Sequence, residues 1–234
     1  MRFPSSSNFR TVGAPDRPLR NLYRSDHLGA LDDADAAQIR ALGIARVLDF
    51  RGVQERTSAA CRLRDVQVHS LPIEPTIVQK LVALVSQGHG LSGADMVAYM
   101  RDTYRGFVRE GTPRFAEFFR HLLESDQPTV FHCTAGKDRT GFAAVLLLKA
   151  VGASDEEVWQ DYLLTNDRLQ LPARTRLALA PEAMHVLWRV QPGFLQAALD
   201  EVDARYGSLE GYFREGLGLG EAQRRTLRAL YLPD

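Results

Sequence analysis

The chain has 234 residues, 45% of them hydrophobic, and its 29 basic and 29 acidic residues balance to a formal charge of zero. A chain of this length and composition can bury one substantial core, so we expect a single domain over residues 1–234. The balanced charge argues against a global attraction to nucleic acid, and because no apolar run approaches the length of a bilayer span, we expect no integral membrane segment.

The first half of the chain carries the signals of an α/β protein. Residues 1–30 are rich in Pro, Ser and Arg, so we expect a loop-like opening there, with a short strand around residues 22–24. Residues 31–42 have the pattern of a helix, because Asp32 supplies an acidic start and Gly43 a stop signal. Two strands are expected to follow, at 45–50 and 66–72. Strands that alternate with helices in this way are typical of a parallel sheet.

Residues 75–111 form a candidate lid. Two helical patterns occur in this segment, separated by a glycine-rich break at 88–93. In the second pattern, apolar residues recur at intervals of three and four: Met96, Tyr99, Met100 and Tyr104. One interpretation of this stripe is ordinary core packing. The other is a mobile cover over a pocket, hinged at the glycines.

A second strand-and-helix unit follows the candidate lid. An amphipathic helix presents five large apolar side chains to the core: Phe115, Phe118, Phe119, Leu122 and Leu123. An apolar strand at 129–131 and an apolar helix at 142–148 come next. Ser154 and Glu157 form a capping-box pattern that opens another helix. Beyond Pro172 the chain is expected to be helical to its end.

The loop between that strand and the apolar helix carries the main chemical signal. Its sequence is His132-Cys133-Thr134-Ala135-Gly136-Lys137-Asp138-Arg139-Thr140, with five residues between the cysteine and the arginine. A short loop with a glycine at a helix N-terminus can turn its backbone amides inward and bind an anion. Such dipoles and a nearby guanidinium favour a thiolate, so Cys133 is predicted to be a nucleophile. Arg139 can grip two phosphoryl oxygens with its planar fork.

The neighbours of this pair are assigned supporting roles. His132 is expected to be buried behind the loop and to order it, and the Thr140 hydroxyl is expected to donate to the cysteine sulfur. A phosphoryl-transfer step also needs a carboxylic acid near the leaving oxygen. Asp138, inside the loop, is the first candidate, and Asp49, at the end of a neighbouring strand with Arg51, is the second. The sequence does not choose between these two acids.

The loop resembles the active-site loop of the protein tyrosine phosphatase superfamily, in which Cys-x5-Arg has His before it and Thr-Gly after it. The fuller form His-Cys-x-x-Gly-Lys-Asp-Arg is similar to a bacterial branch typified by mycobacterial and Listeria phosphatases. Further matches run along nearly the whole chain: Asn8-Phe9-Arg10, Tyr23 to Leu28, Val47 to Arg51 with Glu55, Asp161 to Asn166, and Tyr206-Gly207-Ser208. Two departures are Thr11 to Ala14, in place of Asp-Leu-Gly-Gly, and Phe50, in place of Leu.

The resemblance implies a fold and a set of roles. It implies a mostly parallel central sheet flanked by helices, with a helical lid insertion. It implies Cys133 as nucleophile, Arg139 as phosphate clamp, and a phosphate-binding loop made of Thr134, Ala135, Gly136, Lys137, Asp138 and Arg139. Members of the branch act on phosphotyrosine, often on phosphoserine and phosphothreonine, and several act on phosphoinositides, a preference associated with the residues here numbered Lys137 and Asp138.

The expected reaction is therefore hydrolysis of a phosphomonoester through a cysteinyl-phosphate, with no metal or other cofactor. The expected partner is a phosphorylated protein or a phosphoinositide, which are its substrates. One alternative is a phosphatase of small molecules, such as an inositol phosphate or a metabolite. Another is a non-catalytic module that uses the same loop only to bind phosphate.

The cysteines also bear on where the protein works. Two cysteines, Cys61 and Cys133, make no disulfide framework, and a nucleophilic thiol requires reducing surroundings. We expect a cytoplasmic protein, with export without a cleavable signal as the alternative. Cys61 is expected to be a packed cysteine; the alternative is a resolving partner that protects oxidised Cys133.

Overall fold

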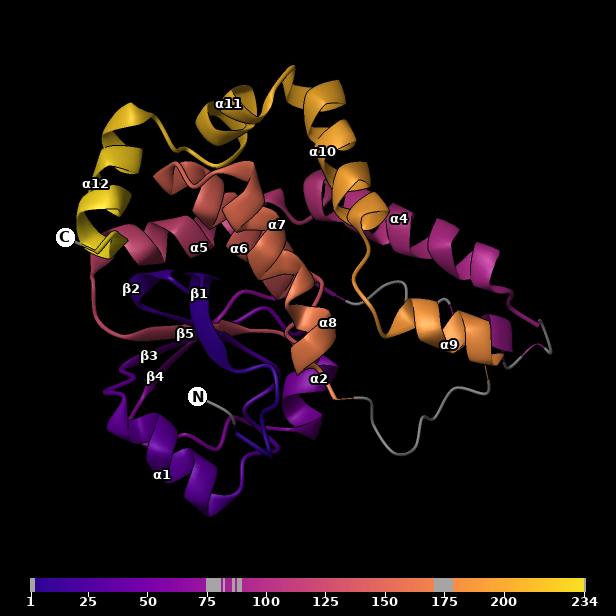
Figure 1. Cartoon of the computed structure of the whole chain (residues 1–234), viewed down its shortest axis with the longest axis horizontal. Coiled ribbons are helices and arrows are strands. Elements are labelled where there is room, and N and C mark those ends of the chain that lie inside the picture. The colour runs from indigo at the N-terminus through magenta and orange to yellow at the C-terminus, as the bar shows by residue number, and fades with distance from the viewer. Residues whose placement is uncertain are drawn as a thin grey trace.

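A computed structural model describes residues 3–74, 81, 83–85, 87, 90–170 and 179–233 of the chain (Figure 1). Within this part, five strands form one sheet: β1 (Arg10–Ala14), β2 (Arg17–Ser25), β3 (Arg46–Asp49), β4 (Gln67–Ser70) and β5 (Thr129–His132). The order across the sheet is β1-β2-β5-β3-β4, and β1 and β2 are antiparallel while the other neighbours are parallel. The predicted α/β fold with a mostly parallel sheet is confirmed.

β5 is the central strand, and every one of its residues is buried, as expected for a parallel strand covered on both faces. It pairs with β2 on one side and with β3 on the other, so that both Ser25 and Asp49 lie opposite His132. The carboxyl ends of parallel strands meet at one edge of a sheet. The residues that follow β2, β3 and β5 therefore converge at this edge, and Cys133 is one of them.

The two faces of the sheet carry separate hydrophobic clusters because side chains alternate along a strand. Val47 and Val130 belong to a smaller cluster with α1 (Asp33–Ala41), which lies below the sheet in Figure 1. Leu48 and Phe131 belong to the larger cluster, with the phenylalanines of α5 (Thr112–Glu124) and with α6 (Arg139–Val151), on the opposite face.

The other helices of the described part surround these layers. They are α2 (Val53–Ser58), α4 (Gly93–Arg109), α7 (Asp155–Leu163), α8 (Thr165–Arg168), α9 (Pro181–Leu187), α10 (Pro192–Tyr206), α11 (Leu209–Gly211), the π-helix η1 (Tyr212–Gly216) and α12 (Glu221–Tyr231). α4 packs against both α9 and α10, and Figure 1 shows these three helices extending to one side of the sheet.

Most of the expected elements occur where the sequence placed them. The Asp32 side chain caps α1 by accepting from Asp35 N at 2.7 Å, and Ser154 and Glu157 form the predicted capping box at the start of α7. The expectation of a loop-like opening is wrong for residues 10–14 and 17–21, which belong to the β1–β2 hairpin, whereas the short strand expected around residues 22–24 lies within β2. Exposed arginines and a register shift beside Gly13, whose φ is +107°, interrupt the apolar alternation that would have indicated strands.

The candidate lid at 75–111 is described only in part, because residues 75–80, 82, 86, 88 and 89 lie outside the described residues. Its second helical pattern corresponds to α4. Met96, Met100 and Tyr104 are fully buried in the larger cluster, and this burial agrees with the interpretation of the stripe as core packing. Movement of the segment as a lid stays a prediction.

Candidate active site

The loop of residues 133–138 joins the end of β5 to the start of α6. Cys133 is a free thiol, only 3% exposed, at the first position of this loop. α6 begins at Arg139, so the positive end of its dipole lies directly after the loop. Because nearly all of α6 is buried in the core, the helix start is fixed relative to the strand end.

The loop carbonyls are bound from outside the loop. Thr134 O accepts from His27 N at 3.0 Å, Ala135 O from Asn8 Nδ2 at 2.9 Å, and Gly136 O from Asn8 Nδ2 and Arg24 Nη2, both at 3.0 Å. In a trans peptide the N–H points away from the C=O. The amides that follow these carbonyls are therefore directed to the opposite side, which is the geometry of an anion-binding nest.

Glycine is required at position 136. Its φ is +63°, and a Cβ there would collide with the carbonyl oxygen of Ser25, at the end of β2. The loop thus lies against the neighbouring strand more closely than any other residue type would allow.

Two buried arginines share one carboxylate beneath the loop. Arg24 Nη1 contacts Asp161 Oδ2 at 2.5 Å, and Arg10 Nε lies 3.8 Å from Asp161 Oδ1. Arg10 also donates to Thr165 Oγ1 at 3.0 Å. Burial and, after it, the charge of Arg24 lower the pKa of Arg10 to about 9, against the opposing effect of Asp161. The surplus positive charge favours an anion in the loop above it.

Arg139 is held by Glu55, from the start of α2. Its Nη1 and Nη2 donate to the two carboxylate oxygens of Glu55 at 2.7 and 2.8 Å, and Nη1 also donates to Ile73 O at 2.9 Å. Burial alone would lower the pKa of Arg139, but the Glu55 hydrogen bonds and the charges of Cys133, Glu55 and Asp138 raise it above its ordinary value. The guanidinium is therefore fixed in one plane and fully charged.

Glu55 is itself fully bound. Its carboxylate accepts from Gly52 N at 2.8 Å and from the Thr134 hydroxyl, in addition to Arg139. Burial would raise the pKa of Glu55, but these hydrogen bonds and the Arg139 charge outweigh it and lower the pKa to about 2. Glu55 thus connects Thr134 and Arg139, near the two ends of the loop, to the start of α2.

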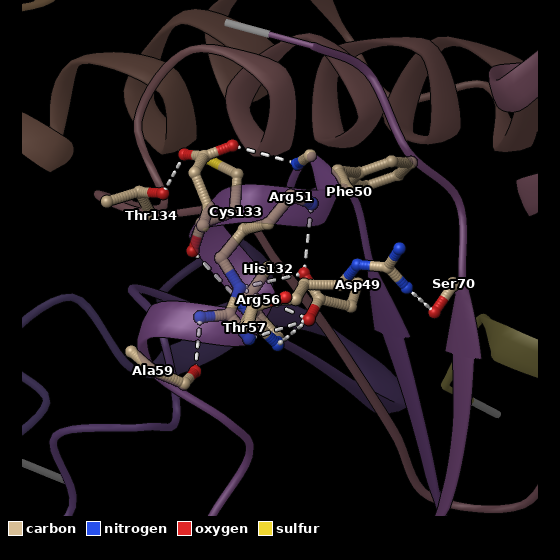
Figure 2. Close-up of polar contacts among 12 residues, drawn as sticks. Asp49, Phe50, Arg51, Arg56, Thr57, Ala59, Ser70, His132, Cys133 and Thr134 are labelled. Atoms are coloured by element: carbon tan, nitrogen blue, oxygen red, sulfur yellow. Dashed lines mark hydrogen bonds and ion pairs between the residues drawn. The ribbon is translucent and has the colours of Figure 1, made fainter.

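Asp49 and Arg51 form a buried ion pair at the end of β3. Arg51 Nη2 donates to Asp49 Oδ2 at 2.7 Å, and both residues are 1% exposed. Figure 2 shows this pair together with His132, Cys133 and Thr134. Burial would raise the pKa of Asp49, but the nearby His132 and the hydrogen bonds from Arg51 lower it.

His132 lies behind the nucleophile, as its place in the sequence suggested. Its Nδ1 donates to the carbonyl oxygen of Cys133 at 3.1 Å, and its Nε2 lies 3.7 Å from Asp49 Oδ2. Complete burial lowers the pKa of His132 to about 4, against the opposing charge of Asp49. The ring is neutral at neutral pH and acts on the loop through the Cys133 carbonyl.

The other candidate acid, Asp138, lies on the opposite side of the loop. Its side chain is 24% exposed, and its Oδ1 accepts from the Tyr104 hydroxyl at 3.1 Å and lies 3.2 Å from Lys137 Nζ. Lys137 is turned away from solvent and donates at 2.7 Å to the carbonyl oxygen of Leu187, the last residue of α9. The backbone of Lys137 belongs to the loop, whereas its ammonium group contacts the end of α9.

Two further residues complete the set named from the sequence. Thr140 is fully buried, and within the described residues its Oγ1 has no hydrogen-bond partner, so its donation to the Cys133 sulfur stays a prediction. Cys61 is a free, half-buried cysteine beside the smaller cluster, and burial raises the pKa of its thiol. Its role as a resolving partner remains untested.

The sequence placed Glu55, Asn8 and Arg24 in motifs without giving them a role. Their partners in the loop are between 79 and 128 residues away along the chain. One signal could have pointed to Glu55. It lies in the first turn of α2, the helix that follows β3, and β3 pairs with β5, the strand that precedes Cys133.

No helix in residues 3–74, 90–170 and 179–233 is long and apolar enough to cross a membrane. The same described residues hold no group of three or more His, Cys, Asp or Glu side chains that could bind a metal ion.

The chain is similar to known proteins over nearly its whole length. The model of the tyrosine phosphatase family matches residues 1–233. The triple specificity protein phosphatase PtpB of Mycobacterium tuberculosis is 34% identical, over 98% of this chain and 98% of its own. A tyrosine-protein phosphatase of Nostoc commune is 25% identical, over 90% of this chain and 74% of its own. The catalytic core of a PP-IP phosphatase from S. cerevisiae covers 85% of this chain and 93% of its own, with 13% identity and a TM-score of 0.42.

Proposed function

Because the chain belongs to the tyrosine phosphatase family, we propose that it hydrolyses phosphotyrosine through a cysteinyl-phosphate on Cys133, without a metal ion. One observation carries this proposal. Cys133 begins a loop whose carbonyls are bound from outside, and Arg139, at the other end of the loop, is locked by Glu55. These are the parts that nucleophilic attack on a phosphoryl group requires.

In the first step, the Cys133 thiolate attacks phosphorus, the S–P bond forms and the ester P–O bond breaks. The leaving oxygen takes a proton from a carboxylic acid. In the second step, a water oxygen attacks phosphorus, the S–P bond breaks and the carboxylate takes a proton from that water. The net reaction converts a phosphomonoester and water into an alcohol or phenol and phosphate, and it restores both thiolate and acid.

Arg139 and the loop amides stabilise the charge on the phosphoryl oxygens. Both hydrogens of Arg139 Nη1 and one hydrogen of Nη2 are directed to Glu55 and Ile73 O, which leaves Nε–H and the second Nη2 hydrogen for the substrate. The guanidinium does not reorganise during the reaction, so its interaction energy goes to the transition state. Glu55 is therefore a positioning residue in this proposal.

Asp138 is the better candidate for the acid. Its side chain is partly exposed beside Arg139 in the loop, and only its Oδ1 has a protein partner in the described part of the chain. Both oxygens of Asp49, in contrast, accept from the Arg51 fork in a buried site. We assign to Asp49 and Arg51 a structural role: their ion pair lies beside His132, which binds the Cys133 carbonyl through Nδ1.

We extend the proposal to phosphoserine and phosphothreonine, because a relative that matches this chain over 98% of its own length is named a triple specificity phosphatase. Phosphoinositide hydrolysis is a secondary proposal. Lys137, the residue associated with it, is 3% exposed and bound to Leu187 O, an arrangement that supports a structural role for this side chain. We place the working site of the enzyme in the cytoplasm, because its thiolate requires reducing surroundings.

The test is a substrate panel with the purified chain under reducing conditions. We expect turnover of p-nitrophenyl phosphate and of a phosphotyrosine peptide, with the inositol phosphates and phosphoinositide vesicles turned over more slowly. Cys133→Ser should abolish turnover, whereas Cys61→Ser should leave it unchanged and serves as the matched control. Turnover that survives Cys133→Ser would remove the nucleophile, and binding of phosphate without any turnover by the wild type would favour a non-catalytic module.

A further inference from the structure

Three side chains from distant parts of the sequence form a hydrogen-bonded chain that ends on the loop. The Tyr162 hydroxyl, from α7, lies 2.9 Å from the Tyr104 hydroxyl, from α4. The Tyr104 hydroxyl in turn lies 3.1 Å from Oδ1 of Asp138. At its far end, Tyr162 is also 3.3 Å from the carbonyl oxygen of Gln191, just before α10.

Core packing alone does not account for this chain. Both tyrosine rings are fully buried, and phenylalanine would fill the same space without a hydroxyl to satisfy. Burial raises the pKa of Tyr104 and of Tyr162 above the ordinary value, so both hydroxyls keep their protons across the working pH range. Each hydroxyl can then donate one hydrogen bond and accept another.

The chain can satisfy Asp138 in both of its protonation states. When Asp138 is ionised, Tyr162 donates to Tyr104, and Tyr104 donates to Oδ1. When the acid proton sits on Oδ2, Oδ1 is a carbonyl oxygen and still accepts from Tyr104, so the chain keeps its direction. A general acid changes its charge once in each half of the proposed reaction, so a partner that serves both states suits such a group.

We propose that Tyr104 is a positioning residue that holds Oδ1 of Asp138, backed by Tyr162, so that Oδ2 is left to protonate the leaving oxygen. The inference rests on the proposed reaction and on Asp138 as its acid. Lys137 Nζ, 3.2 Å from Oδ1, approaches the same oxygen, and this second contact leaves Oδ2 without a partner among the described residues. The core helix α4 thus reaches the reacting centre through one hydroxyl.

The proposal predicts a selective loss that depends on the leaving group. Acid catalysis matters more for phenyl phosphate, whose phenolate is a poor leaving group, than for p-nitrophenyl phosphate, whose nitrophenolate leaves easily. Tyr104→Phe should lower kcat on phenyl phosphate about tenfold, the expected effect of losing one hydrogen bond to a charged group, and should lower kcat on p-nitrophenyl phosphate less than about twofold.

Two further variants complete the series. Tyr162→Phe should give a smaller loss of the same selective kind, about threefold, because Tyr104 can still donate to Asp138. It tests the chain from its other end, so the proposal stays testable even where Tyr104→Phe is unstable. Tyr212→Phe is the matched control, because the Tyr212 hydroxyl is also buried but hydrogen-bonds Thr112, at 3.0 Å. It should leave kcat unchanged on both substrates. Melting temperatures measured on all three variants report any loss of folding.

Asp138→Asn is the reference variant, because it tests Asp138 as the acid independently of the positioning role of Tyr104. If Asp138→Asn shows the selective loss on phenyl phosphate and Tyr104→Phe matches Tyr212→Phe, the positioning role is overturned and the proposed reaction stands. If Asp138→Asn lowers kcat equally on both substrates, Asp138 is not the acid, and the positioning role of Tyr104 is overturned with it. An equal loss on both substrates for Tyr104→Phe would also overturn the proposal, because it would indicate only a structural effect.

Discussion

The sheet side and the helical side of the loop hold it with different kinds of contact. On the sheet side, Asn8 and Arg24 donate to main-chain carbonyls of the loop, and the supporting charges are deeply buried. On the helical side, the contacts involve loop side chains, since α4 contacts Asp138 through Tyr104 and the end of α9 accepts from Lys137. The sheet side therefore shapes the anion nest, and the helical side orients the groups that project from it.

This difference predicts two kinds of failure. Damage to the sheet side should cost stability and affect all substrates alike, because it alters the main chain that binds the phosphoryl group. Damage to the Tyr104–Asp138 contact on the helical side should spare the fold and should depend on the leaving group, because it moves the side chain that acts on that group. The selective loss expected for Tyr104→Phe is the clearest case of the second kind.

The largest effect is expected on the sheet side, at Asp161, whose carboxylate is shared by Arg10 and Arg24. Asp161→Asn should lower the free energy of unfolding by about 3–5 kcal/mol, because it leaves Arg10 and Arg24 buried without a counter-ion. Denaturant unfolding measures this loss. The control is Asp167→Asn on α8, an exposed site where we expect less than about 0.5 kcal/mol. An equally small effect at both positions would show that the base of the loop does not depend on this ion pair.

A smaller effect on stability is expected from the ion pair between Glu55 and Arg139. The pKa of Glu55 falls from 4.5 to about 2 on folding, so the pair contributes its full stability above pH 4.5 and loses it as the pH falls towards 2. The shift corresponds to about 3 kcal/mol at most. The difference in unfolding free energy between the wild type and Glu55→Gln should therefore shrink over this range, and a difference independent of pH would contradict the assignment.

The smallest effect sharpens the helical side. Lys137→Met should lower kcat/KM about threefold, and equally on a phosphotyrosine peptide and on phosphatidylinositol monophosphate vesicles, because its ammonium group contacts Leu187 O. Lys149→Met, at the far end of α6, serves as the control. A loss confined to the vesicles would instead show that Lys137 binds the lipid headgroup.

The sequence predicted local features well and distant ones poorly. Cys133 and Arg139 belong to one short loop between a strand and a helix, so their roles follow from spacing and context. Glu55 and Tyr104 reach the same loop from α2 and α4, and no local pattern indicates which residues the fold brings there. Single-sequence reasoning could also not decide between Asp49 and Asp138, because the buried Arg51 fork that occupies Asp49 is a feature of the folded chain.

The central claim is that Cys133 carries the phosphoryl group between the two steps. Rapid quenching of the enzyme with a radiolabelled phosphotyrosine peptide, followed by peptide mapping, tests it directly. We expect label on the peptide that contains Cys133 in the wild type and none in Cys133→Ser. Label on any other residue, or label that persists in Cys133→Ser, would contradict the account.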